Sequence, residues 1–327
     1  EAYEVLKLKL ENTSPEKIGC ITGDLTNMET AYAAKELFNK VFKSNLIESR
    51  SENYYVNFSE KENYRFNSNI SGIEDTDLIL LVGCNPRYEA TILNSRIRKS
   101  YLKSKLPIFS SNDIGDQTYP YEILDNSTNL IKDIIEGRNK LSEKIIQSKK
   151  PMVIIGQSVL KLKSGKYIFE ELKKFLNKNN KIKNEWNSLN VLSKDASTVG
   201  SYDLTLFSSN NGRNLLLEKL NEKSIDLLFL LGQDKLKIDR KDLFVVYVGS
   251  HGDDGSKNSD LILPGSAYTE QDGYYTNLEG KIQKAFKASY PPGEANEDWK
   301  IINNLAEFMN NRKLFNDKDE LESSMFN

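Results

Sequence analysis

The stretch DLILLVGCNPRYEATILNSRIR, residues Asp77–Arg98, carries the clearest fold signal in the chain. Its first part, Asp77–Cys84, is apolar from its second residue up to Gly83, which is typical of a parallel strand buried on both faces. Glycine permits a tight turn, and Pro86 suits the first turn of the helix predicted over Tyr88–Lys103. The stretch therefore predicts a strand, a turn and a crossover helix, the repeating unit of α/β proteins.

The same alternation of short apolar runs and helical periodicity extends in both directions from this stretch. Other predicted strands are Lys17–Thr22, Leu106–Ser110, Pro151–Gly156, Ser224–Gly232, Leu243–Gly249 and Leu261–Leu263. Other predicted helices are Met28–Lys43, Asn129–Gly137, Lys140–Lys149, Ile168–Leu176 and Glu297–Met309. The polar stretch Trp186–Gly212 fits neither pattern. The chain is predicted to be an α/β protein with doubly wound, mainly parallel sheets.

The length of the chain favours more than one domain. Its 327 residues exceed the roughly 250 to 300 residues beyond which a single core stops growing. Because the strand and helix pattern restarts near residue 150, we expect a first α/β domain over residues 1–150 and a second over residues 151–310. Residues 311–327 are polar, and we expect a tail that is mobile unless a partner orders it.

Composition excludes several classes of function. A formal net charge of −2 supplies no electrostatic attraction for DNA or RNA, so no nucleic-acid partner is expected. The apolar runs are far shorter than the roughly 18 to 20 residues of a membrane-spanning helix, so no direct membrane insertion is expected. The chain has two cysteines, Cys20 and Cys84, which are too few and too far apart for a zinc or iron–sulphur site. Neither a G-x-G-x-x-G nor a G-x-x-x-x-G-K-[ST] motif is present.

The turn from Gly83 to Pro86 follows a predicted strand, where open α/β sheets bind ligands. We favour a structural interpretation, in which Gly83 permits the turn, Asn85 caps the helix and Pro86 begins it. Charged residues of the following helix would form a surface network or contact a neighbouring subunit: Arg87, Glu89, Arg96 and Arg98. A solvated face is the commoner outcome.

The loop around His251, the single histidine, combines an imidazole with Asp253 and Asp254, which raises the idea of a metal or a general base. One imidazole is thin evidence, and we interpret the loop as structural. A polar and aromatic group would line a pocket or, as we prefer, fill the edge of a domain interface: Tyr268, Glu270, Tyr274, Tyr275 and Asn277. Trp299 is expected to anchor the last helix in the core. We assign no catalytic, cofactor-binding or metal-binding residue.

Three stretches resemble the molybdopterin oxidoreductases, in the form found in the large iron–sulphur subunit of respiratory complex I. Asp77–Arg98 resembles the strand, G-x-N-P turn and helix of that family. Leu243–Lys281, LFVVYVGSHGDDGSKNSDLILPGSAYTEQDGYYTNLEGK, resembles its D-x-I-L-P-G-x-A-Y-x-E and T-N-x-E-G segments. Pro291–Leu305, PPGEANEDWKIINNL, resembles its closing P-P-G-x-A-x-x-D-W-x-I-I helix. The start and middle of the chain agree with the family only in pattern.

The resemblance implies two α/β domains facing a cleft, which in active relatives holds a pterin-bound molybdenum or tungsten. It implies a structural role in the peripheral arm of complex I, on the matrix side of the mitochondrial inner membrane, with no cofactor in this chain. The iron–sulphur clusters would lie on a separate chain carrying the N-terminal part of the subunit, by gene splitting or processing, and other peripheral-arm subunits would be partners. Two alternatives are a fragment of a genuine molybdopterin-dependent formate dehydrogenase or nitrate reductase, and a free-standing binding module.

Overall fold

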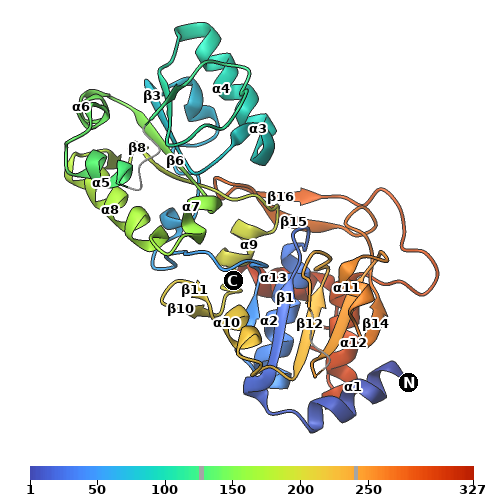
Figure 1. The fold of residues 1–327 in the computed structure, drawn as a ribbon. Coiled ribbons are helices and arrows are strands. Elements are labelled where there is room, and N and C mark those ends of the chain that lie inside the picture. The colour runs from blue at the N-terminus through green and yellow to red at the C-terminus, as the bar shows by residue number, and fades with distance from the viewer. Residues whose placement is uncertain (125–128, 239–241) are drawn as a thin grey trace. The chain divides into compact units, whose positions relative to one another are not determined.

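The computed structural model of the chain describes residues 1–124, 129–238 and 242–327, which form two compact units (Figure 1). The first unit comprises Glu1–Asn53, Asp195–Asn277 and Lys281–Asn327, and the second comprises Tyr54–Lys194 and Leu278–Gly280. The units therefore alternate along the chain. The boundary expected at residue 150 does not separate them, because the strand after it pairs with an earlier strand inside the second unit.

The first unit is built on a five-stranded parallel sheet of order β14-β13-β12-β1-β2. Its strands are β1 (Ile18–Thr22), β2 (Ile47–Glu48), β12 (Leu227–Leu231), β13 (Phe244–Gly249) and β14 (Leu261–Pro264). Cys20 of β1 lies opposite Phe229 of β12, so strands from distant parts of the sequence are hydrogen-bonded neighbours. This pairing requires both parts of the chain to belong to one folding unit.

Helices cover both faces of this sheet, since alternate side chains of the strands enter two different hydrophobic clusters. Phe229 and Val246 pack with residues of α2 and α12, whereas Leu228 and Val245 pack with Leu216 of α10. The helices of the unit are α1 (Ala2–Glu11), α2 (Met28–Leu37), the π-helical turn Phe38–Phe42, α9 (Thr198–Asp203), α10 (Leu215–Asn221), α11 (Asp254–Lys257), α12 (Asp298–Asn310) and α13 (Lys318–Phe326). Two small hairpins pair β10 (Ser209–Asn210) with β11 (Arg213–Asn214) and β15 (Gly273–Thr276) with β16 (Ile282–Ala285).

The C-terminal residues 311–327, expected as a tail that is mobile unless a partner orders it, pack into this core. Helix α13 buries Leu321 and Met325 in the same cluster as α2. The preceding segment is tied to α12 by Asn303, whose Nδ2 donates to the carbonyl oxygen of Phe315 (2.8 Å) and whose Oδ1 accepts from the N–H of Leu314 (2.9 Å). A predominantly polar sequence conceals this apolar face because only a few of its residues are buried.

The second unit is also built on a five-stranded parallel sheet, of order β5-β4-β3-β6-β9. Its strands are β3 (Leu78–Val82), β4 (Ile108–Ser110), β5 (Glu122–Ile123), β6 (Pro151–Gly156) and β9 (Leu189–Leu192), and a hairpin pairs β7 (Ile182–Lys183) with β8 (Trp186–Asn187). Its helices are α3 (Pro86–Glu89), α4 (Thr91–Ser104), α5 (Leu130–Ile135), α6 (Lys140–Gln147), α7 (Gln157–Lys161) and α8 (Gly165–Lys178). Short 3-10 turns occupy Pro15–Lys17 in the first unit and Lys61–Asn63 and Ser71–Glu74 in the second.

The predicted fold class is confirmed, because both sheets are parallel and the strands predicted from apolar runs are present. Two details differ. The single helix expected over Tyr88–Lys103 is divided at Ala90, whose backbone (φ −154°, ψ 69°) is not helical. The ambiguous stretch Trp186–Gly212 contains β8, β9, α9 and β10.

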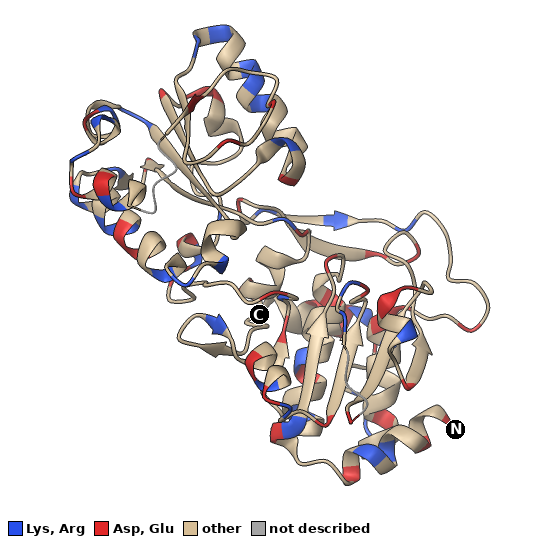
Figure 2. Ribbon diagram, in the orientation of Figure 1, with Lys and Arg blue, Asp and Glu red and all other residues tan. Residues whose placement is uncertain are grey.

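Charged side chains of both signs are interspersed over the helices and loops, whereas the central strands carry none (Figure 2). Within the described ranges, no helix combines the length and the apolar character that crossing a bilayer requires.

Candidate functional site

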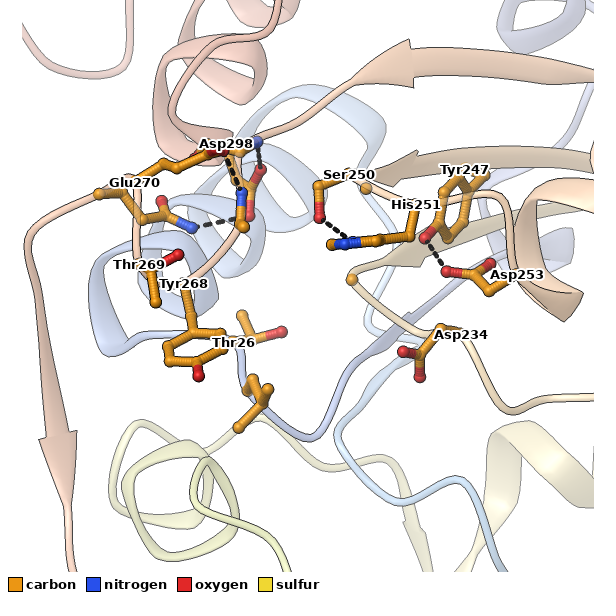
Figure 3. A pocket seen from close by; sticks show the side chains of 16 residues that line it. Thr26, Asp234, Tyr247, Ser250, His251, Asp253, Tyr268, Thr269, Glu270 and Asp298 are labelled. Atoms are coloured by element: carbon orange, nitrogen blue, oxygen red, sulfur yellow. Dashed lines mark hydrogen bonds between the residues drawn. The ribbon is translucent and has the colours of Figure 1, made fainter. Parts of the chain in front are cut away.

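A cavity of about 610 Å³ lies at the carboxyl ends of the strands of the first sheet (Figure 3). The turn after β1 contributes Thr26 to it, the turn after β12 contributes Asp234, and the segment after β13 contributes His251. The segment after β14 contributes Ser266 to Gln271, and α12 contributes its first residue, Asp298. This edge is where open parallel sheets generally bind ligands.

Two glycines approach each other closely where β1 and β12 end, and one of them, Gly232, lines the cavity. A Cβ on Gly23 would lie 1.8 Å from the carbonyl oxygen of Gly232, so no larger residue fits after β1. Gly232 itself has a φ of +62°, a conformation that favours glycine. The two turns can therefore cross at the sheet edge, with the N–H of Gly23 donating to the carbonyl oxygen of Leu231 at 2.8 Å.

Asp298 is the buried carboxylate of the cavity. Its Oδ1 accepts from the backbone N–H of Ser266 and its Oδ2 from Nε2 of Gln271, both at 3.3 Å. Burial, reinforced by the nearby charge of Glu297, outweighs these bonds and raises the pKa of Asp298 to about 7. The side-chain oxygens Ser266 Oγ and Gln271 Oε1 are also buried and have no hydrogen-bond partner in the described structure. The cluster thus contains polar atoms that its own residues do not satisfy.

On another wall, Asp253 links β13 to the short helix α11. Its Oδ2 accepts from the hydroxyl of Tyr247 (2.6 Å), and its Oδ1 accepts from the N–H of Ser256 (3.0 Å). Burial, followed by the hydrogen bond to this carboxylate, raises the pKa of Tyr247 above its usual range. These bonds stabilise the loop, and each oxygen of the Asp253 carboxylate accepts one of them.

His251 lines the cavity from the segment after β13, and its imidazole bonds to a neighbouring serine. Nδ1 of the exposed imidazole shares a hydrogen bond with Oγ of the adjacent Ser250 at 2.8 Å. Among residues 1–124, 129–238 and 242–327, no group of three or more histidines, cysteines and acids is placed to hold a metal ion. The loop lines the cavity through Gly249, Ser250, His251 and Asp253.

The lining of this cavity does not fit the phosphates of a pterin nucleotide. Four carboxylate side chains line it, Asp234, Asp253, Glu270 and Asp298, and no lysine or arginine is among the described residues of the lining. Lysine and arginine are the side chains that usually hold phosphate groups, and the one long helix whose N-terminal turn reaches the described lining, α12, presents the carboxylate of Asp298 there. The two cysteines, Cys20 and Cys84, are both buried, and burial raises the pKa of each thiol.

In the second unit, the turn after β3 is bonded to a neighbouring loop. Gly83 adopts a φ of +58°, and Pro86 is the first residue of α3, as the sequence predicts. The predicted cap by Asn85 is absent: its Nδ2 donates to the carbonyl oxygen of Ile114 and its Oδ1 accepts from Nε2 of Gln117, each at 2.9 Å. Asn85 fastens a neighbouring loop to the turn and does not cap the helix.

The charged residues of α3 and α4 form ion pairs with other segments of the second unit. These pairs join Arg87 to Asp116 (2.7 Å), Arg96 to Glu74 (3.0 Å) and Glu89 to Lys194 (3.9 Å). Arg98 is exposed. The predicted charge network therefore consists of ion pairs with neighbouring segments of the same unit, at exposed or half-buried positions.

The predicted polar and aromatic group separates into two sets. Tyr268 and Glu270 line the cavity, whereas Tyr274 packs its ring edge-on against Phe326 at 5.0 Å. Tyr275 belongs to the hairpin and donates its hydroxyl hydrogen to the carbonyl oxygen of Leu25 at 3.0 Å, and the N–H of Asn277 donates to the carbonyl oxygen of Lys281 at 2.9 Å.

Helix α12 contributes Trp299 to the core and Asp298 to the cavity. Trp299 is buried in the core, as expected. Sequence reasoning missed the buried polar residues of the cavity, Ser266, Gln271 and Asp298, although an acid at the start of an apolar helix was a visible signal.

Comparison with known proteins identifies similar chains. The family described as molybdopterin oxidoreductase matches residues 1–308. The chain is 38% identical to the NADH-ubiquinone oxidoreductase 75 kDa subunit of Reclinomonas americana, over 98% of this chain and 48% of that one. It is 38% identical to the mitochondrial 78 kDa subunit of Candida albicans, over 97% and 43%, and 35% identical to that of Neurospora crassa, over 99% and 43%. The chain thus spans about half the length of these curated relatives.

A solved structure with a similar fold is a chain of the formyltransferase/hydrolase complex of Methylorubrum extorquens, with a TM-score of 0.65. The match covers 94% of this chain and 95% of that one at 12% sequence identity. At this identity the likeness concerns the fold alone.

Proposed function

Because the chain belongs to the molybdopterin oxidoreductase family, and its relatives include large subunits of NADH-ubiquinone oxidoreductase, we propose that it is a structural portion of the peripheral arm of respiratory complex I. It would lie on the matrix side of the mitochondrial inner membrane, in the complex that transfers electrons from NADH to ubiquinone and pumps protons. The observation that carries the proposal is 38% identity over 98% of the chain to a 75 kDa subunit.

The role proposed for these residues is positional, with no redox centre among them. Supporting this, the two cysteines are buried in the cores of separate units and burial raises the pKa of both thiols. The carboxylate-rich cavity of the first unit is poorly suited to a nucleotide phosphate. The iron–sulphur clusters of the assembly would then reside in the cluster-bearing part of the subunit, on a partner chain, and the other partners would be further peripheral-arm subunits.

The test is the composition of the native particle that contains this chain. An affinity tag on the chain, native electrophoresis, mass spectrometry and metal analysis should together find a large particle with NADH dehydrogenase activity, complex I subunits and iron. Molybdenum or tungsten in stoichiometric amount, with formate or nitrate turnover, would replace the proposal with a genuine molybdopterin oxidoreductase. Recovery of the chain only in a low-mass species would favour a free-standing binding module.

A further inference from the structure

The cavity of the first unit is lined by two buried polar residues, each with a side-chain oxygen that has no hydrogen-bond partner in the described structure, next to the carboxylate of Asp298. Asp298 accepts bonds from Ser266 and Gln271, which places these three residues together. Ser266 and Gln271 are only 6% and 5% exposed, yet the hydroxyl of Ser266 and the amide oxygen of Gln271 have no partner in the described structure. A buried polar atom without a partner costs free energy, so a ligand that supplies N–H donors here would be stabilised.

The negative charge of the cavity lining favours a positively charged ligand. Besides Asp298, the carboxylates of Asp234, Asp253 and Glu270 line the cavity, and its described lining includes no lysine or arginine side chain. An anionic ligand would be repelled, whereas a cation would offset several like charges at once. Tyr268 also lines the cavity and is 55% exposed, and aromatic faces attract organic cations.

We propose that this cavity binds a small primary ammonium compound, whose N–H groups donate to Asp298, Ser266 and Gln271. The three donors of an ammonium group match three neighbouring acceptors, whereas a quaternary ammonium has no hydrogen-bond donor to offer them. A volume of about 610 Å³ is sufficient for such a molecule and its substituent. This inference goes beyond the structural role proposed above and does not depend on it.

Ethylammonium chloride is the simplest probe, titrated into the purified full chain above pH 7, where Asp298 is ionised, and followed by calorimetry at constant ionic strength. A dissociation constant of about 1 mM or weaker is expected, since very small ligands gain at most about 1.5 kcal/mol per heavy atom and ethylammonium has three. Tetramethylammonium, which has no N–H donor, should bind at least about tenfold more weakly, a difference of about 1.4 kcal/mol. Inorganic pyrophosphate should not bind. Absence of ethylammonium binding, equal binding of tetramethylammonium, or preference for pyrophosphate would each overturn the proposal.

Substitutions of the cavity residues test whether ethylammonium binds at Asp298 and Gln271. Asp298→Asn keeps the side-chain shape and should weaken ethylammonium binding by about tenfold or more. Glu307→Gln is the matched control, because Glu307 is an exposed carboxylate on the same helix outside the cavity, and it should bind as the parent does. If Asp298→Asn prevents folding, as judged by circular dichroism, Gln271→Leu removes the unpaired amide oxygen while retaining the charge, and it too should lose affinity. Unchanged affinity in a folded variant at either position would overturn the proposal.

Discussion

The buried ion pair between Glu48 and Arg50 gives the sharpest prediction of stability. Arg50 donates through Nε and Nη2 to the two carboxylate oxygens of Glu48, at 3.0 and 2.6 Å, and both side chains are 0% exposed. Arg50 also donates through Nη1 to the carbonyl oxygen of Gly212 (3.0 Å), and the N–H of Ser208 reaches Glu48 Oε2 at 3.3 Å. The pair thus joins the end of β2 to a segment far along the chain in the first unit.

Arg50→Met would leave the carboxylate of Glu48 buried without its cation. Removal of one partner from a buried pair typically costs about 3 to 5 kcal/mol in free energy of unfolding. This is a large part of the roughly 5 to 15 kcal/mol that stabilises a domain. For a domain of roughly 150 to 250 residues, about 2 to 4 °C of melting temperature is lost per kcal/mol, so a decrease of roughly 6 to 20 °C is expected.

Urea denaturation followed by tryptophan fluorescence can measure this, because the chain has one tryptophan in each unit. In a Trp186→Phe background, Trp299 reports the first unit alone. The control is Arg96→Met, since Arg96 and Glu74 form a pair whose side chains are 41% and 33% exposed, and its loss should cost less than about 1 kcal/mol.

Replacing both members of the buried pair, Glu48→Leu with Arg50→Met, should recover part of the loss because no unpaired charge remains. If Arg50→Met alone lies within about 0.5 kcal/mol of the parent, as an ordinary surface substitution does, the reasoning about the buried charge is refuted.

Three further predictions concern the first unit. Gly23→Ala should abolish folding of the first unit, because the added Cβ would lie 1.8 Å from the carbonyl oxygen of Gly232, and circular dichroism should show the loss of structure. Gly252→Ala is the control and should fold normally, because nothing lies within 4 Å of the added Cβ. Leu321→Ala should lower the free energy of unfolding by about 2 to 5 kcal/mol, since that side chain is wholly buried in α13; an effect under about 0.5 kcal/mol would show that the helix does not pack as described. The folded-state pKa of Asp298, about 7, lies above its unfolded value near 4. The parent should therefore lose up to about 4 kcal/mol of its free energy of unfolding as pH rises from about 4 through 7, measured by urea denaturation. Asp298→Asn should abolish that part of the pH dependence.

The local sequence determined the fold class and most of the elements. Strands such as β3, β6, β12 and β13 were predictable because a strand buried on both faces must be continuously apolar, a property that neighbouring residues reveal by themselves. The turn conformation of Gly83 and the core position of Trp299 were predictable for similar reasons, since backbone freedom and helical periodicity are local. The motif order around β3, β13 and α12 also sufficed to indicate the family.

Only the tertiary structure decided which strands pair and which polar groups meet. The domain boundary failed because hydrogen bonds place β6 beside β3 and β1 beside β12, and strand pairing at this separation leaves no trace in local periodicity. The acceptors of the cavity come from two segments, Ser266 to Gln271 and the start of α12, which are brought together by folding. The local sequence determines whether a segment forms a helix, a strand or a turn. Burial and unsatisfied hydrogen bonds depend on neighbours that are distant along the chain.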